Sequence, residues 1–462
     1  MTLNRVCAAS LAFLLAMEGC GGAGKSQAPL GAASETQGAP ASSGSAPVAL
    51  ARTARPITGG ENDYREIVAA SGATRRVLLG ESTHGTHEYY RERARISEML
   101  IRRHGFNAVA LEGDWAPIAR LNDYVRGSGN DRSAAQAMGE LTRFPQWMWR
   151  NAEFAAFVER LRSLNLERPA AERVGLYGMD VYDLFDAADA VLAYLAGNDP
   201  ARAGQAQKAY HCFGRYRRST QAYGEATRRG ASCRRQAEDV EALVRKLPRP
   251  AEPVAAEHHF AAVRSAASVT AAEAYFRAAY AGSLAWNVRD RAMAATVEEI
   301  AAHQAALSAR PGKVVMWSHN SHTGDARATY AARRGELNIG QLMRERHGEA
   351  AFLIGFFSHG GKVLAAPEWD AAGRVYEMKP ALAGSHEALF RQIGLPAFSL
   401  PIRGNTEAMR SLKEPMLQRA IGVIYQPQSE RMSHYFDARM AEQFDAAIYF
   451  DRSTAVTPLP PR

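Results

Sequence analysis

Histidine and acidic side chains follow short apolar runs at four separate places in the sequence. The four segments are Gly80-Glu81-Ser82-Thr83-His84-Gly85, Leu111-Glu112-Gly113-Asp114-Trp115, Gly178-Met179-Asp180 and Ser318-His319-Asn320-Ser321-His322. Imidazole titrates near neutral pH, and a neighbouring carboxylate fixes its tautomer and raises its basicity. If loops far apart in the sequence bring these groups together, the pattern favours general acid/base chemistry.

Each candidate residue also has a structural interpretation. His84 could cap the next helix, but Glu81 lies on the same turn, so we predict that His84 is catalytic with Glu81 as its partner. Glu112 could be a helix-capping partner. Arg93 lies two turns into a helix that starts near His87, where it could pair inward with a carboxylate or lie on the surface.

The remaining candidates divide between chemistry and binding. We place Asp180 and His322 among the substrate-binding residues, although His322 could serve mainly in packing or orientation. His319 is the histidine of its pair that we expect to take part in the chemistry. One imidazole would activate water, and the other could protonate the leaving group as an imidazolium.

Two common hydrolase signatures are absent from the sequence. It has no GxSxG nucleophile motif, which disfavours a serine hydrolase of the common type, and no HExxH zinc motif. The histidines of His84-Gly85-Thr86-His87 and of the 319–322 segment could hold a divalent metal, but they would lie on turns. We therefore expect no cofactor and no metal, with a divalent metal as the alternative.

Alternating strands and helices indicate the fold class. Strands are predicted at 77–80, 108–112, 174–178 and 313–317, with a helix from His87 to His104, and strands resume at 351–357, 422–425 and 446–450. This order predicts an α/β fold with a mainly parallel central sheet flanked by helices. Residues from about 183 to 308 show only helical spacing and are expected to form a helical insertion or cap. In open parallel sheets the ligand crevice lies beyond the carboxyl ends of the strands, where the four polar segments fall.

The composition is that of a globular protein. The chain has 462 residues, of which 47% are apolar and 23% are charged, and a net charge of +8. That excess is modest for this length, so we expect no nucleic-acid partner. Residues 201–250 hold 12 basic and 4 acidic residues, a local excess that we interpret as a solvated helix surface.

The first 60 residues have the composition of an export signal and a linker. A basic start, an apolar run at 6–17 and Gly19-Cys20 resemble a bacterial lipoprotein signal, although Glu18 departs from that pattern. We expect 1–19 to be a signal peptide, 20–59 a disordered Gly/Ala/Ser/Pro tether and 60–458 the folded domain. The protein would then be exported and held at a membrane through lipid on Cys20. A match to the phosphate-loop pattern at 19–26 lacks the strand and helix that such a loop joins, so we reject it.

Two cysteines remain in the predicted domain. Cys212 and Cys233 could form a disulfide in an oxidising compartment, clamping two helices of the basic segment, or stay two separate buried thiols.

Several motifs, taken together and in this order, resemble the erythromycin esterase-like family. They are the 80–88 segment, Arg93, 111–114, Asn287-Val288-Arg289-Asp290-Arg291-Ala292-Met293, 317–322, 338–340, 420–425 and 444–446, so the resemblance runs from about 60 to 457. Some members of this family are described as succinoglycan biosynthesis proteins, and membership does not identify a substrate.

The resemblance implies hydrolysis of a small-molecule ester or macrolactone, such as the macrolide erythromycin, by a histidine-activated water. It makes His84 the general base with Glu81 as its partner, and His319 the second essential histidine, able to position or protonate. Arg93 and Glu112 become part of the polar site. The alternative is a lipid-tethered metal- or haem-binding protein without hydrolase activity.

Overall fold

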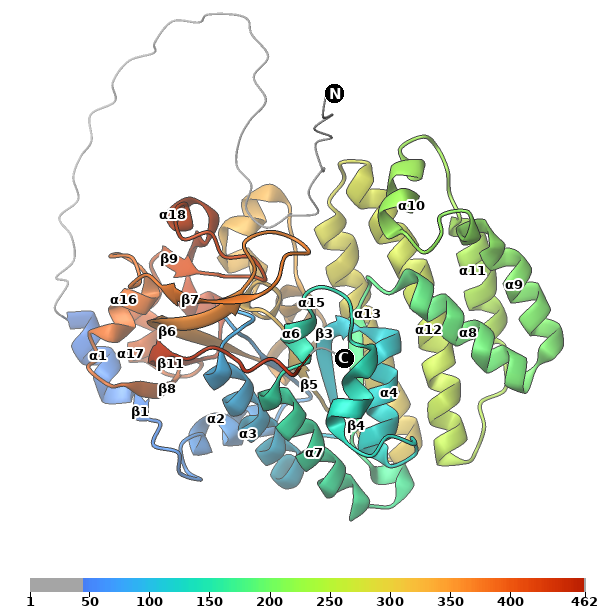
Figure 1. Ribbon diagram of the computed structural model, residues 1–462. Coiled ribbons are helices and arrows are strands. Elements are labelled where there is room, and N and C mark those ends of the chain that lie inside the picture. Colours follow the sequence, from blue (N-terminus) through green and yellow to red (C-terminus); the bar gives the residue numbers. More distant parts are fainter. Residues whose placement is uncertain (1–44, 461–462) are drawn as a thin grey trace, which may run out of the picture.

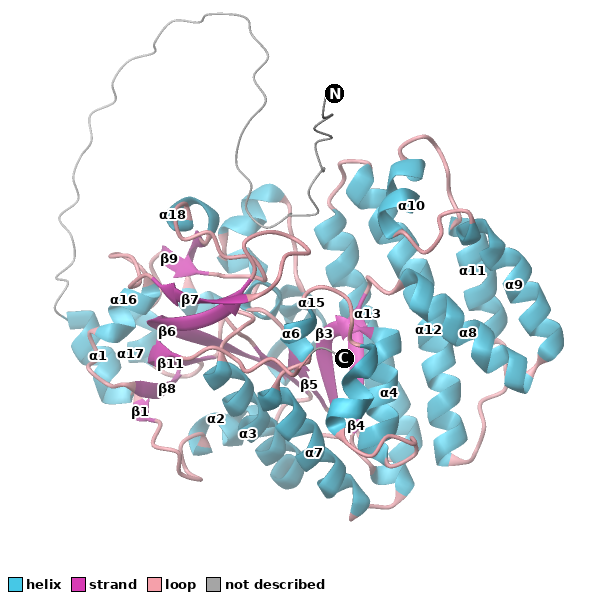
Figure 2. Ribbon diagram, viewed as in Figure 1, coloured by secondary structure: helices cyan, strands magenta, loops and turns pink. Residues whose placement is uncertain are grey.

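The computed structural model describes residues 45–460 and contains a nine-stranded sheet (Figures 1 and 2). Its strand order is β1-β8-β11-β6-β2-β5-β3-β4, with β7 paired to β6. The strands are β1 (Arg55–Pro56), β2 (Arg76–Leu79), β3 (Ala108–Asp114), β4 (Gly175–Asp180), β5 (Val314–Trp317), β6 (Ala351–Ala365), β7 (Arg374–Met378), β8 (Ala397–Pro401) and β11 (Ala446–Ser453). β9 (Met416–Arg419) and β10 (Tyr435–Ala438) form a separate pair.

The pairings from β11 through β4 are parallel, and β1, β7 and β8 add antiparallel pairings. This confirms the predicted α/β class with a mainly parallel sheet. Short apolar strands suit its centre because both faces are covered by helices. In β2, for example, Val77 and Leu79 pack into the cluster on one face, whereas Leu78 packs into the cluster on the other.

Helices cover both faces of the sheet. One hydrophobic cluster joins it to α2 (Arg65–Gly72), α3 (His87–His104), α4 (Trp115–Arg126) and α7 (Ala152–Leu166). The other joins it to α1 (Ser45–Thr53), α13 (Ala285–Ser308), α15 (Ile339–His347), α16 (His386–Arg391), α17 (Thr406–Ser411) and α19 (Met440–Gln443). Helix α3 has the predicted bounds and ends at Gly105, whose φ of +69° favours glycine.

Residues 184–308 are helical, as predicted for the insertion. The insertion contains α8 (Leu184–Asn198), α9 (Pro200–Gly214), α10 (Thr220–Thr227), α11 (Arg234–Arg245), α12 (Pro253–Tyr280) and α13, and α8 to α12 have a hydrophobic core of their own. Helices α8 to α12 lie to the right of the sheet in Figure 1, whereas α13 packs on the sheet. A disulfide joins Cys212 in α9 to Cys233, the residue before α11. Of the two states that the sequence left open, the structure has the disulfide.

Four short α-helices and five 3-10 helices complete the described part of the chain. These are α5 (Ala134–Ala137), η1 (Met138–Glu140), α6 (Gln146–Trp149), η2 (Ala170–Glu172), α14 (Asn320–Thr323), η3 (Ala326–Ala328), η4 (Tyr330–Arg334), η5 (Gly348–Ala350) and α18 (Glu430–Ser433). No helix among residues 45–460 is long and apolar enough to cross a membrane.

Two predictions about chain organisation need correction. The tether predicted for 20–59 extends too far, because Ser45–Thr53 is helical, Leu50 is fully buried, and β1 pairs with β8. The strand predicted at 422–425 is absent. That segment makes one isolated bridge, at Ile424, and its residues 422–424 line the cavity described below instead of joining the sheet. The predicted signal segment and Cys20 lie outside the described residues.

Candidate active site

A cavity of about 580 Å³ opens beyond the carboxyl ends of the central strands, between the sheet and the helical insertion. His84, Glu112, Asp180 and His319 line it from the loops and strand ends of the sheet. The insertion contributes Tyr275, Trp286 and Arg289. The cavity is of the size that small-molecule sites commonly have. It brings together four of the seven site residues predicted from the sequence.

A connected group of three side chains begins at the wall of this cavity. His84 lines the wall, and Glu81 and Arg93 lie behind it. Glu81 Oε1 lies 2.9 Å from His84 Nδ1, and Glu81 Oε2 lies 2.8 Å from an Arg93 guanidinium nitrogen. Glu81 and Arg93 are fully buried. Because Nδ1 is directed at the carboxylate, His84 carries its proton there, and Nε2 is left as the basic nitrogen.

The Arg93 guanidinium is packed between aromatic rings. Its central carbon lies 4.6 Å from the centre of the Tyr90 ring and 4.8 Å from that of Trp317. These cation–π contacts and the Glu81 carboxylate hold a charge that has no access to water. Of the two positions that the sequence allowed, Arg93 therefore has the inward-facing one, and it fixes the carboxylate that orients His84.

His319 lies opposite His84, with the ring centres 4.9 Å apart. The His319 side chain caps α14, since its Nδ1 accepts a hydrogen bond from the backbone N–H of Ser321 at 3.2 Å. Burial, followed by the nearby His84, lowers the pKa of His319 to about 3. A neutral ring at every working pH disfavours the imidazolium role that the sequence allowed for it.

Glu112 connects His319 to the insertion. Its Oε2 accepts the backbone N–H of His319 at 2.7 Å, and its Oε1 lies 2.8 Å from Arg289. Asp180 binds the same guanidinium through both oxygens, at 2.8 and 2.7 Å. Burial alone would raise the pKa of Glu112, but His322 and then Arg289 outweigh it and hold this pKa well below its usual range.

His322, which we expected to bind substrate, is buried and is not among the residues that line the cavity. The Trp286 ring stacks on the His322 ring with the centres 4.3 Å apart, and His322 Nδ1 lies 2.8 Å from an Asp290 carboxylate oxygen. Burial opposes protonation, but Asp290 and Glu112 raise the pKa of His322 to about 9. His322 Nε2 lies 3.3 Å from Glu112 Oε1 and 2.9 Å from a guanidinium nitrogen of Arg289. Its position matches the orienting role named as the alternative.

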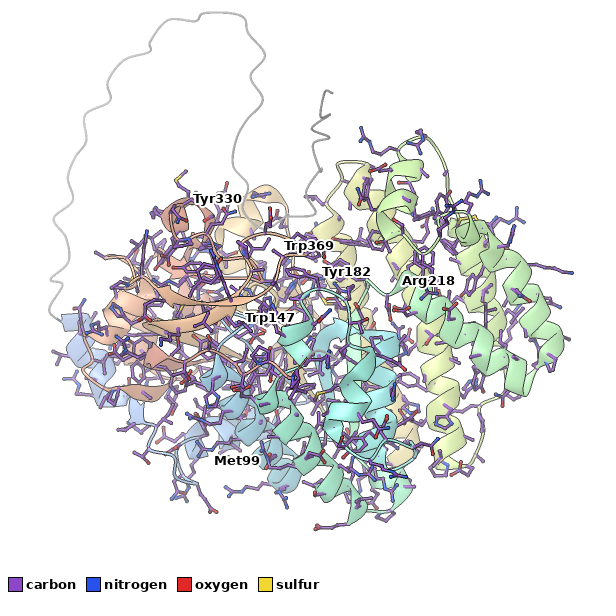
Figure 3. The ribbon with its side chains drawn as sticks, in the orientation of Figure 1. Met99, Trp147, Tyr182, Arg218, Tyr330 and Trp369 are labelled. Atoms are coloured by element: carbon purple, nitrogen blue, oxygen red, sulfur yellow. A yellow bond between two sulfur atoms is a disulfide. The ribbon has the colours of Figure 1, made fainter. Side chains whose placement is uncertain are left out.

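The outer part of the cavity is aromatic and carries a second ion pair. Arg143 binds both oxygens of Asp114, at 2.5 and 3.1 Å, and its guanidinium lies 4.7 Å from the centre of the Tyr182 ring. Trp369 packs against Phe144 at 4.9 Å. Figure 3 places Tyr182 and Trp369 between the sheet and the insertion. This part of the site offers apolar surface to a large ligand.

The donor groups of the site do not form a metal-ligand set. Among residues 45–460, no three His, Cys, Asp or Glu side chains are placed to hold one ion. The acidic groups that face the cavity are instead paired with Arg289 and Arg143.

Arg289, Asp290, Arg143 and Tyr182 belong to this network but were not predicted as site residues. Arg289 and Asp290 lie in the 287–293 segment that carried part of the family resemblance. An arginine on a long helix is usually a surface residue, so its type and spacing alone gave no sign that it faces two buried carboxylates. The only available signal was the adjacent Arg-Asp pair within that segment.

The chain is thus an α/β protein with a buried histidine–carboxylate site beneath a helical insertion. Residues 101–453 match the erythromycin esterase family, and since this is well over half of the chain, the protein belongs to that family. The matched range begins after Glu81 and His84.

Individual relatives are distant. An erythromycin esterase type II from Escherichia coli is 27% identical over 120 residues, and this alignment covers 26% of each chain. The chain therefore matches about a quarter of the length of that relative.

Solved structures share the fold over almost the whole chain. A protein from Bacillus cereus is 18% identical with a TM-score of 0.74, covering 91% of this chain and 100% of the other. A succinoglycan biosynthesis protein is 18% identical with a TM-score of 0.73, covering 89% and 97%. A mutant of the erythromycin esterase EreC, in its open conformation, is 17% identical with a TM-score of 0.61, covering 89% and 100%. The family assignment does not favour the alternative of a metal- or haem-binding protein.

Proposed function

We propose that the protein is a carboxylic ester hydrolase that cleaves an ester or macrolactone with a water molecule activated by His84. The observation that carries this proposal is the Glu81–His84 pair at the wall of a large cavity. Glu81 contacts Nδ1 of His84, which leaves Nε2 as the nitrogen that can accept a proton. Membership of the erythromycin esterase family supports the same reaction class.

The arrangement of groups around His84 suits a general base. The Glu81 carboxylate stabilises the imidazolium that forms when His84 accepts a proton, and Arg93 holds that carboxylate in place. Glu112 and Asp180 are held by Arg289, and we propose that Asp180 shapes the substrate-binding surface. Water would attack directly, so no covalent acyl-enzyme forms.

The shape and lining of the cavity favour a bulky, partly apolar substrate. A cavity of about 580 Å³ accepts a large ring, and Trp149, Tyr182, Trp286 and Trp369 contribute aromatic surface to its lining. A macrolide such as erythromycin is the first substrate to test, because an erythromycin esterase is among the relatives.

A substrate screen tests the reaction class. The purified protein is incubated with erythromycin, other macrolactones and simple carboxylic esters, with and without a chelator, and products are identified by mass spectrometry. We expect at least one ester or lactone to gain one water, with the rate unchanged by the chelator. Binding of a metal or haem without turnover of any ester would overturn the proposal in favour of the alternative function.

We also propose that the protein is exported and anchored in a bacterial membrane through Cys20. The support is the apolar run at 6–17 followed by Gly19-Cys20. Expression in a bacterial host followed by membrane fractionation tests this. The native chain should sediment with membranes and Cys20→Ala should be released, whereas equal release of both would refute lipid anchoring.

A further inference from the structure

Two hydrogen bonds fix the tautomer of the neutral His319 ring, whatever the pKa of that ring. The backbone N–H of Ser321 can only donate, and it points at His319 Nδ1 from 3.2 Å. The hydroxyl of Ser321 lies 2.8 Å from the same nitrogen and can also donate to it. Nδ1 must therefore carry a lone pair, so in the neutral ring the proton is on Nε2.

The N–H at Nε2 is buried but not used by the protein. Nε2 has no hydrogen-bond partner of normal geometry among residues 45–460. The backbone of Ser82 lies near the ring and raises the pKa of His319, but less than the other groups named below change it. The whole residue is 2% exposed and lines the cavity beside His84. A buried polar hydrogen without a partner is costly, so its retention points to a ligand atom that accepts it.

Burial, more than the neighbouring charged groups, keeps the His319 ring neutral. Burial lowers its pKa most, followed by His84, whereas Glu112 raises it and His322 lowers it, and the result is a pKa of about 3. Glu112 is already paired with Arg289 and His322, which limits its ability to stabilise a third cation. The ring is thus a donor of a hydrogen bond and a poor source of a proton.

We propose that Nε2–H of His319 binds the carbonyl oxygen of the substrate and stabilises the negative charge that develops on it. This inference rests on the proposed hydrolase function and assigns a division of labour within that site. His84 and His319 have opposite tautomers across 4.9 Å, so one presents a lone pair to the cavity and the other presents a hydrogen.

Hydrolysis at this site takes two stages, addition of water and loss of the alcohol. His84 Nε2 takes a proton from water while the water oxygen forms a bond to the carbonyl carbon. The π electron pair moves to the carbonyl oxygen, which accepts the hydrogen bond from His319 without receiving its proton. The pair then returns, the bond to the alkoxy oxygen breaks, and His84 gives its proton to that oxygen. The products are a carboxylic acid and an alcohol, and both histidines are regenerated.

Nitrogen NMR tests the tautomer without any substrate. In protein labelled with ¹⁵N at histidine, His319→Asn identifies the His319 signals by their loss. We expect a neutral ring protonated at Nε2 across pH 5.5–8.5. A proton on Nδ1, or a transition to imidazolium within this range, would overturn the inference even if the protein hydrolyses esters.

A matched pair of variants tests the catalytic role. The His319→Asn amide lies near the position of Nδ1 and can keep the cap of α14, but it offers no donor at Nε2. The His319→Gln amide places an N–H near Nε2 and cannot act as an acid. We expect kcat/KM to fall about 10²–10³-fold in His319→Asn, the cost of one oxyanion donor, and clearly less in His319→Gln.

Equal loss in the two variants would instead show that His319 delivers a proton. Thermal unfolding of both proteins separates these effects from damage to the fold. Full activity in His84→Asn would count against the proposed function itself, whereas the NMR result would still stand or fall on its own.

Discussion

At the scale of single residues, the site depends on which nitrogen of each histidine faces the cavity. Nδ1 of His84 donates a hydrogen bond to Glu81, whereas Nδ1 of His319 accepts one from the backbone N–H of Ser321. The same atom is therefore protonated in one ring and unprotonated in the other. Residue type alone could not have separated a base from a hydrogen-bond donor here.

His84→Asn should abolish hydrolysis with folding intact, because it removes the nitrogen that takes a proton from water. The loss of a general base typically costs about 10²–10⁴ in rate. Steady-state kinetics with the substrate found in the screen gives the change, and circular dichroism checks the fold.

Ser82→Ala is the matched control on the same loop. The Ser82 hydroxyl bonds to Tyr89 at 2.8 Å, and Ser82 does not line the cavity, so its loss should have only a modest effect on rate. An inactive Ser82→Ala together with a covalent acyl adduct by mass spectrometry would show that a serine nucleophile operates after all.

Arg93→Met should destabilise the protein by about 3–5 kcal/mol, because it leaves the buried Glu81 carboxylate without its cation. Adding Glu81→Gln removes that unpaired charge, so the double variant should recover much of the stability without recovering activity. Urea denaturation of the two single variants and the double variant measures the coupling. Additive losses would show that the ion pair does not hold Glu81 in place.

The sequence predicted the Glu81–His84 pair because both residues fall on one turn, where contact is local. It left Arg93 undecided, since a helix position does not say which side of the helix is covered. Arg289 was missed for a stronger reason. Its partners Glu112 and Asp180 lie 177 and 109 residues away in the sequence, and only the folded chain brings them together.

At the scale of elements, the central strands could be predicted and the edge of the sheet could not. β2, β3, β4 and β5 are continuous buried runs, which stand out in the sequence. β7 mixes exposed and buried residues over only five positions, and the four residues of β9 are two partly buried and two buried ones. Such short strands resemble loops, and the apolar 422–425 segment was taken for a strand in their place.

The helical insertion contributes Arg289 and Trp286 to the site from α13, while its disulfide lies farther out, between α9 and α11. Helix α12 links these two regions, because its Tyr275 lines the cavity and also belongs to the core of the insertion.

Replacing both cysteines, as Cys212→Ala with Cys233→Ala, should destabilise the insertion by about 3 kcal/mol, the usual effect of freeing a loop of roughly this length. Hydrogen exchange should become faster in α9 and α11, while kcat changes little under conditions where the protein stays folded. Faster exchange at Glu81–His84 instead would show that the insertion and the sheet unfold as one unit.

At the scale of the whole molecule, four buried histidines make the free energy of unfolding depend on pH. Three of them reduce it in acid, and the fourth reduces it in alkali. Burial lowers the pKa of His319 to about 3 and those of His386 and His434 to about 4. Asp290 and Glu112, against burial, raise that of His322 to about 9.

For the three histidines with lowered pKa values, the unfolded chain binds more protons below about pH 6.5. Their contribution to stability is thus complete above pH 6.5 and is lost as the pH falls towards 4. For His322 the sign reverses, since the folded state holds the extra proton. Its contribution is complete below pH 6.5 and is lost as the pH rises through 9.

His386 allows the acid side to be tested away from the active site. It is fully buried, and its Nε2 lies 3.0 Å from the carbonyl oxygen of Ala438. His386→Gln keeps a donor for that carbonyl but removes the titrating group. The slope of unfolding free energy between about pH 4.5 and 6 should fall by about 1.4 kcal/mol per pH unit, the value for one proton. The exposed His211, changed to Gln, serves as the control and should leave the slope as it was. Urea denaturation at a series of pH values measures all three proteins, and equal slopes in the native chain and His386→Gln would show that burial of a neutral His386 does not drive the loss of stability in acid.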